Sequence, residues 1–364
     1  MTLSLKPSMN WLFVFIPVTL IAEHALHAGP PVLFFCAALA IVPIAGLIVR
    51  STEQVAMRTG DAIGGLLNAT FGNAPELIIA MVALRAGLLE MVRASLIGAI
   101  LANLLLAMGV AFFLGGLRRH EQTFRAEAAR VYSSMMLLAV ISLIIPSAFG
   151  RYFSEADALR QVHFLNVGIA VVLLFAYGLY LFFSMKTHPE FFASGEGGSE
   201  HQEEGPAWSM PRAIGSLIAA SVLAAWMSEI LVGAAEGTGQ ALGMSPTFIG
   251  IVFLAVIGGA AESGSAISMA LKNKMDLSVG IALGSSIQIA LFVAPILVLA
   301  SYLVAPEPLH LSFNRAEIGS LFLGVLIAVT VSGDGRANWY RGVQLLTLYA
   351  IIALMFYFIP SLAS

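Results

Sequence analysis

Two glutamates lie inside apolar, glycine-broken stretches of this chain, in matching local sequences. Glu76 ends the run Gly72-Asn73-Ala74-Pro75-Glu76, and Glu262 ends the run Gly258-Gly259-Ala260-Ala261-Glu262, 186 positions later (262 − 76). A carboxylate costs about 2.5–3.5 kcal/mol at the centre of a membrane helix on insertion scales, so one kept there is a candidate for function. Two of them beside helix-breaking sequences predict a cation site at the midplane of a repeated transporter fold.

The atoms around the two carboxylates indicate which cation such a site would suit. Pro75 lacks a backbone N–H and disturbs the preceding turn, and the glycines weaken helix continuity. Backbone carbonyls near Gly72 and Gly258 are therefore expected to join the carboxylates as ligands, because a freed carbonyl in a membrane must find a partner. An oxygen-only set suits a hard cation such as Ca²⁺, which takes about six to eight oxygens. His and Cys, which softer metals favour, do not surround the motifs.

The same carboxylates can explain coupling to protons. Desolvation and mutual repulsion disfavour two adjacent negative charges, so an empty site is expected to bind protons near neutral pH, and an arriving divalent cation would displace them. Competition for one site, combined with alternating access, exchanges the cation for protons without a nucleotide. No cofactor is expected, since glycine-rich stretches such as Gly115-Gly116 lack the Lys-Ser/Thr of a phosphate-binding loop.

The composition predicts that these motifs belong to an all-α integral membrane protein. Of the 364 residues 59% are hydrophobic and 11% are charged, against about 25% charged in a typical soluble domain. The single cysteine gives no disulfide framework, and a net charge of −3 gives no reason to expect a nucleic-acid partner. Apolar runs that suit a lipid bilayer predict eleven transmembrane helices, at 10–28, 31–57, 61–86, 92–116, 128–150, 160–184, 211–237, 245–271, 275–303, 312–332 and 339–360.

The chain divides into two halves that match each other. Aligning the two glutamates also aligns Gly98 with Gly284, each 22 positions after its glutamate. Each half holds five spans, an odd number, so the second half must enter the membrane in the opposite orientation, which predicts two inverted five-helix repeats. The expected divisions are an N-terminal transmembrane helix (1–30), the first repeat (31–185), an acidic linker (186–210) and the second repeat (211–364).

The charged residues predict how the chain is oriented. With eleven spans, most of the 18 Lys and Arg residues fall on the side of the N terminus, which places the N terminus and the acidic linker in the cytoplasm of a prokaryotic cell and the spans in its inner membrane. The linker is either a solvated connection between the two bundles or an acidic segment that gathers cations. The first apolar run also resembles a signal peptide, but Glu23 and His24 interrupt it, which favours an uncleaved helix.

Further polar residues lie in the helices next to the two motifs. Glu53 and Glu229 occupy the helix before each motif, and each either takes part in proton coupling or bridges helices structurally. Asn103, Ser285 and Gln288 belong to small, polar patches in the helix after each motif. The two amides are ambiguous, because such groups also hold transmembrane helices together, by about 0.6–2 kcal/mol.

At these motifs the chain resembles the calcium/proton antiporters (cation/proton exchangers, CAX) of the Ca²⁺:cation antiporter superfamily. The resembling stretches are 64–78, 258–276, 284–290 and 334–339. The resemblance implies eleven transmembrane helices, inverted five-helix repeats, a dispensable first helix and an acidic cytoplasmic segment. It also implies the site residues: Glu76 and Glu262 as Ca²⁺ ligands and proton carriers, Asn103, Ser285 and Gln288 as lining residues, and Gly72 and Gly258 as sources of carbonyl oxygens.

The second motif departs from the pattern of that family. The family usually reads Gly-Asn-Ala-Ala-Glu-His, whereas this chain has Gly259 in place of the asparagine and Ser263 in place of the histidine. The first motif keeps its asparagine, Asn73, as a supporting residue. The second motif thus loses an amide that can hold a carboxylate or water, and an imidazole that titrates near neutral pH. Any unusual selectivity is expected to come from the Glu262 half.

The expected function is the exchange of cytoplasmic Ca²⁺ for external H⁺, and three alternatives remain. The nearest is an antiporter of the same architecture that moves Na⁺, K⁺ or Mn²⁺ against H⁺, which cation competition would distinguish. A membrane-embedded metal-dependent enzyme would need a water-activating ligand set, and no His-Glu-x-x-His arrangement occurs in the sequence. A passive channel would transport the cation without a pH gradient.

Overall fold

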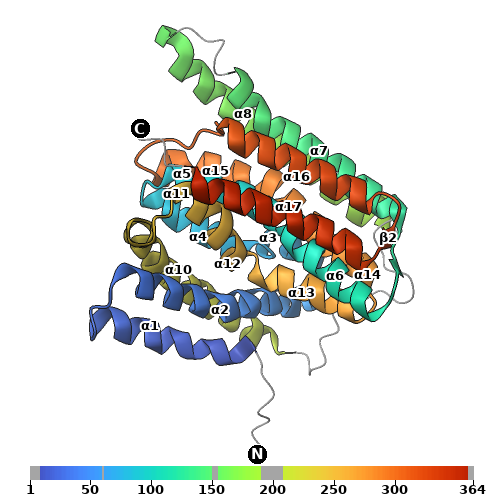
Figure 1. Cartoon of the computed structure of the whole chain (residues 1–364), viewed down its shortest axis with the longest axis horizontal. Helices are drawn as coiled ribbons and strands as arrows, with labels where there is room; N and C mark the ends of the chain where they lie inside the picture. Colours follow the sequence, from blue (N-terminus) through green and yellow to red (C-terminus); the bar gives the residue numbers. More distant parts are fainter. Residues whose placement is uncertain (1–8, 60, 150–154, 190–207, 360–364) are drawn as a thin grey trace, which may run out of the picture.

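Long apolar helices make up almost all of the chain that the computed structural model describes, namely residues 9–59, 61–149, 155–189 and 208–359 (Figure 1). Eight helices in these ranges are long and apolar enough to cross a membrane. A ninth span is formed if a pair of helices bent by 59° at Gly259 counts as one. The described chain is thus mostly helical, with several helices long and apolar enough to cross a membrane, as the composition predicted.

The first half of the chain contains the first motif and the helices that precede and follow it in sequence. Its elements are the 3₁₀ turn η1 (Met9–Val14), α1 (Phe15–His24), α2 (Pro30–Thr59), α3 (Asp61–Phe71), α4 (Ala74–Arg85), α5 (Leu89–Leu101), the π-helical turn η2 (Ala102–Ala107), α6 (Met108–Arg118), the strand β1 (Gln122–Thr123), α7 (Ala126–Phe149), α8 (Glu155–Phe182) and the π-helical turn η4 (Phe183–Thr187).

The second half repeats this order of long, broken and bulged helices. Its elements are α10 (Met210–Leu242), α11 (Pro246–Phe248), the π-helical turn η5 (Ile249–Leu254), α12 (Ala255–Gly258), α13 (Ala260–Leu271), α14 (Met275–Gln288), the π-helical turn η6 (Ile289–Val293), α15 (Ala294–Val304), α16 (Arg315–Ser332), the strand β2 (Arg336–Ala337) and α17 (Trp339–Phe358). The short strands β1 and β2 pair antiparallel and tie the two halves together.

Both glutamate motifs form breaks in helical spans. α3 and α4 are separated by Gly72 and Asn73, while α12 and α13 are separated by Gly259. The helices after the two breaks, α4 and α13, begin 186 positions apart (260 − 74), the same offset as the glutamates. Each glutamate therefore lies in the first turn of the helix that follows its break, where unsatisfied N–H groups favour negative charge. Pro75 fits there because a residue at that position needs no backbone donor.

The helices that follow the motifs occupy the centre of the molecule. In the continuous helix Leu89–Arg118, 83% of the most apolar 18-residue stretch is buried. In the peripheral helix Gln161–Thr187, 17% of the corresponding stretch is buried. Both central helices contain a π-helical turn, η2 after α5 and η6 after α14, and such turns often occur at functional sites. Large apolar side chains are exposed on the outer helices, which a lipid environment would cover. Examples are Val172 and Phe175 on α8 and Phe358 on α17.

Three of the eleven predicted spans are not continuous long helices. The segment 10–28 forms η1 and the short helix α1, and 61–86 forms α3 and α4 around the first break. The segment 245–271 forms α11, η5 and α12 before the bend at Gly259 and α13 after it. The number eleven and the inverted orientation of the repeats stay predictions, as do the boundaries of the four divisions. The acidic part of the linker, 190–207, lies outside the described residues.

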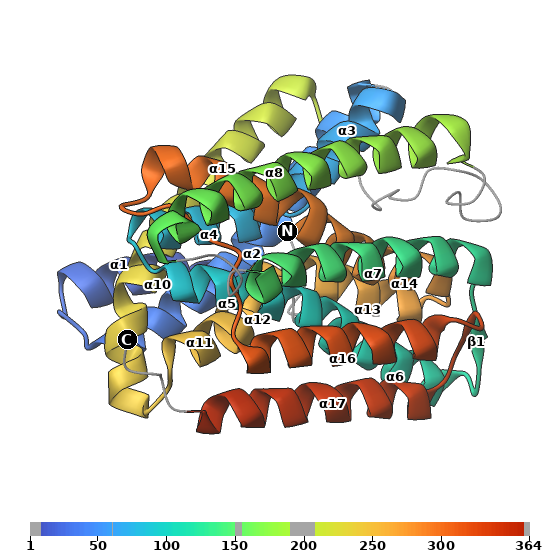
Figure 2. The ribbon, with the colours of Figure 1, turned by 90° about the horizontal axis from the view of Figure 1, so that it is seen from above.

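Helices α16 and α17 lie side by side at one edge of the molecule, and α17 also packs closely against α6 (Figure 2). A Cβ on Gly342 of α17 would be 2.6 Å from the carbonyl oxygen of Gly109 and 2.8 Å from Cα of Phe113. These two helices thus approach so closely that only glycine fits at the contact.

Replacing Gly342 with valine is expected to lower the thermal midpoint of unfolding, because overpacking costs about 1–3 kcal/mol. Tryptophan fluorescence of the protein in detergent measures the midpoint. The matched control is Gly168→Val on α8, where a Cβ meets nothing within 4 Å. Equal midpoints for the two variants would contradict the close contact.

Candidate cation site

The side chains of Glu76 and Glu262 lie at the centre of the molecule, and their residues are only 8% and 7% exposed. All four carboxylate oxygens are buried and have no hydrogen-bond partner among the described residues. An isolated buried carboxylate is strongly unfavourable unless it is paired, binds a metal or takes up a proton. Since the two side chains are close enough to interact electrostatically, the pair is suited to a cation or to protons.

Glycines in the second break let the backbone approach the first glutamate. A Cβ on Gly258 would lie 2.9 Å from Cγ of Glu76, which real Cβ atoms essentially never show. A Cβ on Gly259 would lie 3.6 Å from Oε1 of Glu76 and 3.5 Å from Oδ1 of Asn103. The break around Gly258 and the Glu76 side chain therefore pack against one another, which brings the two motifs together.

A pair of amides links the first break to the end of α14. The Asn73 side chain donates a hydrogen bond to Oε1 of Gln288. This leaves Oδ1 of Asn73 as a buried oxygen without a partner in the described part of the chain. The hydrogen bond to Gln288 fixes the Asn73 side chain and leaves its Oδ1 available to a ligand, and the supporting role of Asn73 stays a prediction.

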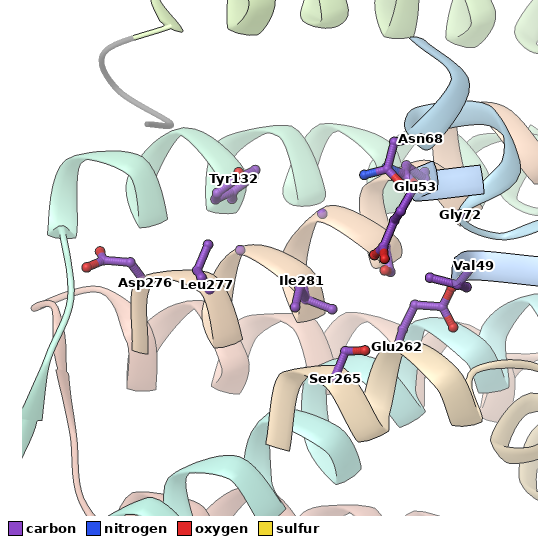
Figure 3. Close-up of a pocket in the computed structure, with 14 residues that line it drawn as sticks. Val49, Glu53, Asn68, Gly72, Tyr132, Glu262, Ser265, Asp276, Leu277 and Ile281 are labelled. Atoms are coloured by element: carbon purple, nitrogen blue, oxygen red, sulfur yellow. The ribbon is translucent and has the colours of Figure 1, made fainter. Parts of the chain in front are cut away.

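A cavity of about 260 Å³ reaches the Glu262 side of the pair (Figure 3). Three carboxylates from three helices line it: Glu53 from α2, Glu262 from α13 and Asp276 from α14. Figure 3 shows Glu53 close to the inner end and Asp276 at the far end, with the side chain of Tyr132 between them along the wall. The remaining lining residues include Asn68, Gly72, Ser265, Gly284, Ser285 and Gln288.

Asp276 was not among the site residues expected from the sequence. Its Oδ1 accepts the backbone N–H of Arg125 at 2.7 Å, which fixes the carboxylate at the far end of the cavity. A signal for it exists in the repeat, because Asp276 follows Glu262 by 14 positions and Glu90 follows Glu76 by 14. Both acidic residues lie in the first turn of the next helix.

The Glu76 side of the pair opens onto a different and much smaller space. This second cavity has a volume of about 10 Å³ and is lined by Glu76, Ser95, Leu254 and Ile289, among others. A water molecule needs roughly that volume or more. The two glutamates therefore line two separate cavities, a larger one that we call the open cavity and a much smaller one that we call the shut cavity.

The other predicted site residues are distributed unevenly around the pair. Ser285 is buried and lines the open cavity, and Asn103 is a buried residue of η2 whose Nδ2 has no partner in the described ranges. Glu53 lines the open cavity, whereas Glu229 is an exposed residue of α10 that does not line it. Within the described residues no group of three or more His, Cys, Asp or Glu side chains could hold a metal ion. Amides, hydroxyls and carbonyls would have to complete the ligand set.

Broken helices that bring buried, unpaired carboxylates to the centre of a helical membrane protein define the class of secondary ion transporters. The chain belongs to the sodium/calcium exchanger protein family, whose sequence profile matches residues 29–186 and 212–358. The resemblance to calcium/proton antiporters that the motifs carry is thereby confirmed. The family is one of transporters and not of enzymes.

Several known proteins are similar over nearly the whole length. The Ca(2+)/H(+) antiporter of Aphanothece halophytica is 43% identical over 363 residues, which cover 96% of this chain and 96% of that protein. The Ca(2+)/H(+) antiporter ChaA of Bacillus subtilis is 39% identical, with 94% and 96% covered. The solved structure of native YfkE has a TM-score of 0.82 at 37% identity and covers 97% of this chain and 100% of that chain.

The Asn73–Gln288 pair gives a testable expectation about ion binding. A buried amide left without its partner costs about 1–3 kcal/mol, so Asn73→Ala and Gln288→Ala are each expected to weaken Ca²⁺ binding roughly tenfold. The double variant is expected to lose little more than either single one, because both remove the same interaction. Titration calorimetry measures the three affinities, and additive losses would show that the two amides act independently.

Proposed function

We propose that the chain is a secondary active transporter that exchanges cytoplasmic Ca²⁺ for H⁺ across the inner membrane of a prokaryotic cell. The observation that carries this proposal is the pair of buried carboxylates, Glu76 and Glu262, whose four oxygens have no partner in the described structure. The similarity to proteins named Ca(2+)/H(+) antiporters supports the same choice of ions.

The charge of the pair explains why the two ions would compete. Ionised, Glu76 and Glu262 place two negative charges in a medium that solvates them poorly. One Ca²⁺ neutralises both charges, and so do two protons. The Ca²⁺-bound site and the doubly protonated site therefore carry a similar net charge. The empty site with both glutamates ionised has the highest free energy of the three. A protein that changes conformation only when the pair is neutralised would exchange one ion for the other and would not leak either.

The ligand set for Ca²⁺ would combine several kinds of oxygen. The two carboxylates would provide the charge, and Oδ1 of Asn73 and the Ser285 hydroxyl would add neutral oxygens. The residues Asn103, Gln288, Gly72 and Gly258 would complete or support the set through amide and carbonyl groups. Such a mixed oxygen set suits Ca²⁺, which accepts irregular geometry.

The two cavities support alternating access as the transport mechanism. The open cavity of about 260 Å³ runs from Glu262 to Asp276, next to the Lys272–Lys274 connection, while the Glu76 side is shut at about 10 Å³. Lys and Arg collect on the cytoplasmic side of bacterial membrane proteins, so this conformation would face the cytoplasm. Asp276 and Glu53 would then attract Ca²⁺ toward Glu262, because acidic walls raise the local cation concentration.

The reduced polarity around Glu262 favours one second candidate. Gly259 and Ser263 supply neither an amide nor an imidazole to this half of the site. An antiporter of the same fold for Na⁺, K⁺ or Mn²⁺ would need fewer or different ligands. Proton-driven uptake of each cation, measured in one vesicle preparation, separates the two candidates. The proposal expects the fastest uptake for Ca²⁺, and the second candidate expects faster uptake of Na⁺, K⁺ or Mn²⁺ than of Ca²⁺.

Removing either central charge is expected to abolish exchange. In Glu76→Gln and Glu262→Gln, a Ca²⁺ ion would leave a net positive charge in the site, and only one proton carrier would remain. The expected loss of ΔpH-driven Ca²⁺ uptake into inverted vesicles is at least 100-fold, or about 3 kcal/mol. Glu307→Gln, at an exposed loop position, is the matched control. Parental rates in both glutamine variants would refute the proposal.

Glu53 and Glu229 are expected to affect the coupling of transport to protons more than the affinity for Ca²⁺. Glu53→Gln should change the rate of uptake or its dependence on pH, because Glu53 lines the open cavity. Glu229→Gln, at an exposed position of α10, is expected to do the same from the sequence repeat alone. Ca²⁺ binding should persist in both variants, since Glu76 and Glu262 remain. Calorimetry at two pH values measures this, and loss of Ca²⁺ binding in either variant would contradict the assignment.

A further inference from the structure

The shut approach to Glu76 is closed by direct backbone contact between α5 and η5. A Cβ on Gly98 would lie 2.5 Å from Cα of Ile251, and a Cβ on Gly250 would lie 2.7 Å from both Cβ of Ala94 and the carbonyl oxygen of Met91. No side chain larger than hydrogen fits at either glycine. The contact therefore excludes water along its length, as close glycine contacts between membrane helices do.

A hydrogen bond lies at one end of this contact. The Thr247 hydroxyl, at the start of the α11–η5 segment, donates to Oε1 of Glu90 in the first turn of α5 at 2.5 Å. The cavity of about 10 Å³ beside Glu76 is lined by the same two segments, through Ser95 and Leu254. The contact between α5 and η5 thus separates Glu76 from one side of the molecule.

The sequence repeat relates these two glycines to a second pair, of which Gly284 lines the open cavity. The offset of 186 positions relates Gly98 to Gly284 (284 − 98) and Gly250 to Gly64 (250 − 64). Here the two glycines do not meet. A Cβ on Gly284 would find nothing within 4 Å, and the atoms nearest to a Cβ on Gly64 belong to Ala56 of α2. Gly284 instead lines the open cavity of about 260 Å³.

We propose that Gly64 on α3 and Gly284 on α14 are the gate of the open cavity. In the other conformation α3 packs onto α14 through these glycines, as η5 packs onto α5 in the present structure, and the Gly98–Gly250 contact opens. This inference rests on the proposed function, because only a transporter with alternating access needs the second conformation. Forming one glycine contact while the other is lost keeps the two conformations close in free energy, as exchange requires.

The present conformation gives no packing reason for a glycine at position 284. A glycine inside a helix costs about 0.5–1 kcal/mol relative to alanine, and here an added methyl group would touch nothing. The cavity that Gly284 lines also contains Glu262, whose carboxylate is buried and has no partner in the described chain. The gate therefore opens directly onto the ion-binding pair.

Gly284→Val tests the gate without disturbing the present conformation. The larger side chain fits the open cavity, so the protein should fold and keep Ca²⁺ affinity within threefold, but α3 should no longer close onto α14. Uptake of Ca²⁺ into inverted vesicles is expected to fall at least tenfold. Gly284→Ala is expected to slow uptake by about threefold or more, since its counterpart contact at Gly98 admits not even a methyl group. Gly178→Val on α8, also without neighbours within 4 Å, should exchange at the parental rate.

Cysteine labelling reports the conformation without relying on transport. In a Cys36→Ser background, Ser265→Cys lies on the open cavity and Ser95→Cys on the shut one. With Gly284→Val added, labelling by a water-soluble maleimide should persist at position 265 and fall at least fivefold at position 95. Unchanged labelling at position 95, or parental uptake by Gly284→Val, would overturn the gate. If the parent itself does not exchange Ca²⁺ for H⁺, the proposed function fails, while the labelling still tests the gate.

Discussion

The structure depends on stabilising two carboxylates that are buried without hydrogen-bond partners among the described residues. Glu76 and Glu262 are stable in this position only when their charge is neutralised. Each lies in the first turn of a helix that begins at a break, so the helix end favours the negative charge. The breaks in turn require small residues, because the backbone at Gly258 touches the side chain of Glu76. Among the membrane-length helices of the described chain, Leu89–Arg118 is the most enclosed, and it packs at the centre next to this pair.

The two halves are equivalent in sequence offset but differ in environment. The first break contributes Asn73, which is bonded to Gln288, while the same position in the second break is Gly259. The Glu262 side faces an open cavity with three carboxylates, and the Glu76 side faces a closed one. The first difference is present in every conformation, because it is a difference in amino-acid sequence. The second difference belongs to the conformation, because both halves contain the glycines that a closed contact uses.

Much of the fold was predictable from local pattern. Lengths of apolar sequence predicted the long helices, and glycine with proline predicted the break before Glu76, because both act on the backbone within a few residues. The segment 61–86 was expected to be one span, and the same break divides it into two helices. Asp276 was missed because a single aspartate near a helix start is usually a favourable first-turn residue. Only the position of α14 along the cavity shows that its carboxylate faces the path to Glu262.

The sequence by itself determined the residue types of the site, the offset of 186 positions and the departure at Gly259, since these depend on nothing but order along the chain. The tertiary structure decided which groups meet. It joined Asn73 to Gln288 across 215 positions, brought Gly258 against Glu76, and packed Gly98 against Ile251 while leaving Gly284 without a neighbour within 4 Å of its Cβ position. Local sequence cannot specify these contacts, because they depend on how helices that are distant in the chain pack together. Where two conformations have similar free energies, the contacts present in the structure depend on which of the two conformations it represents.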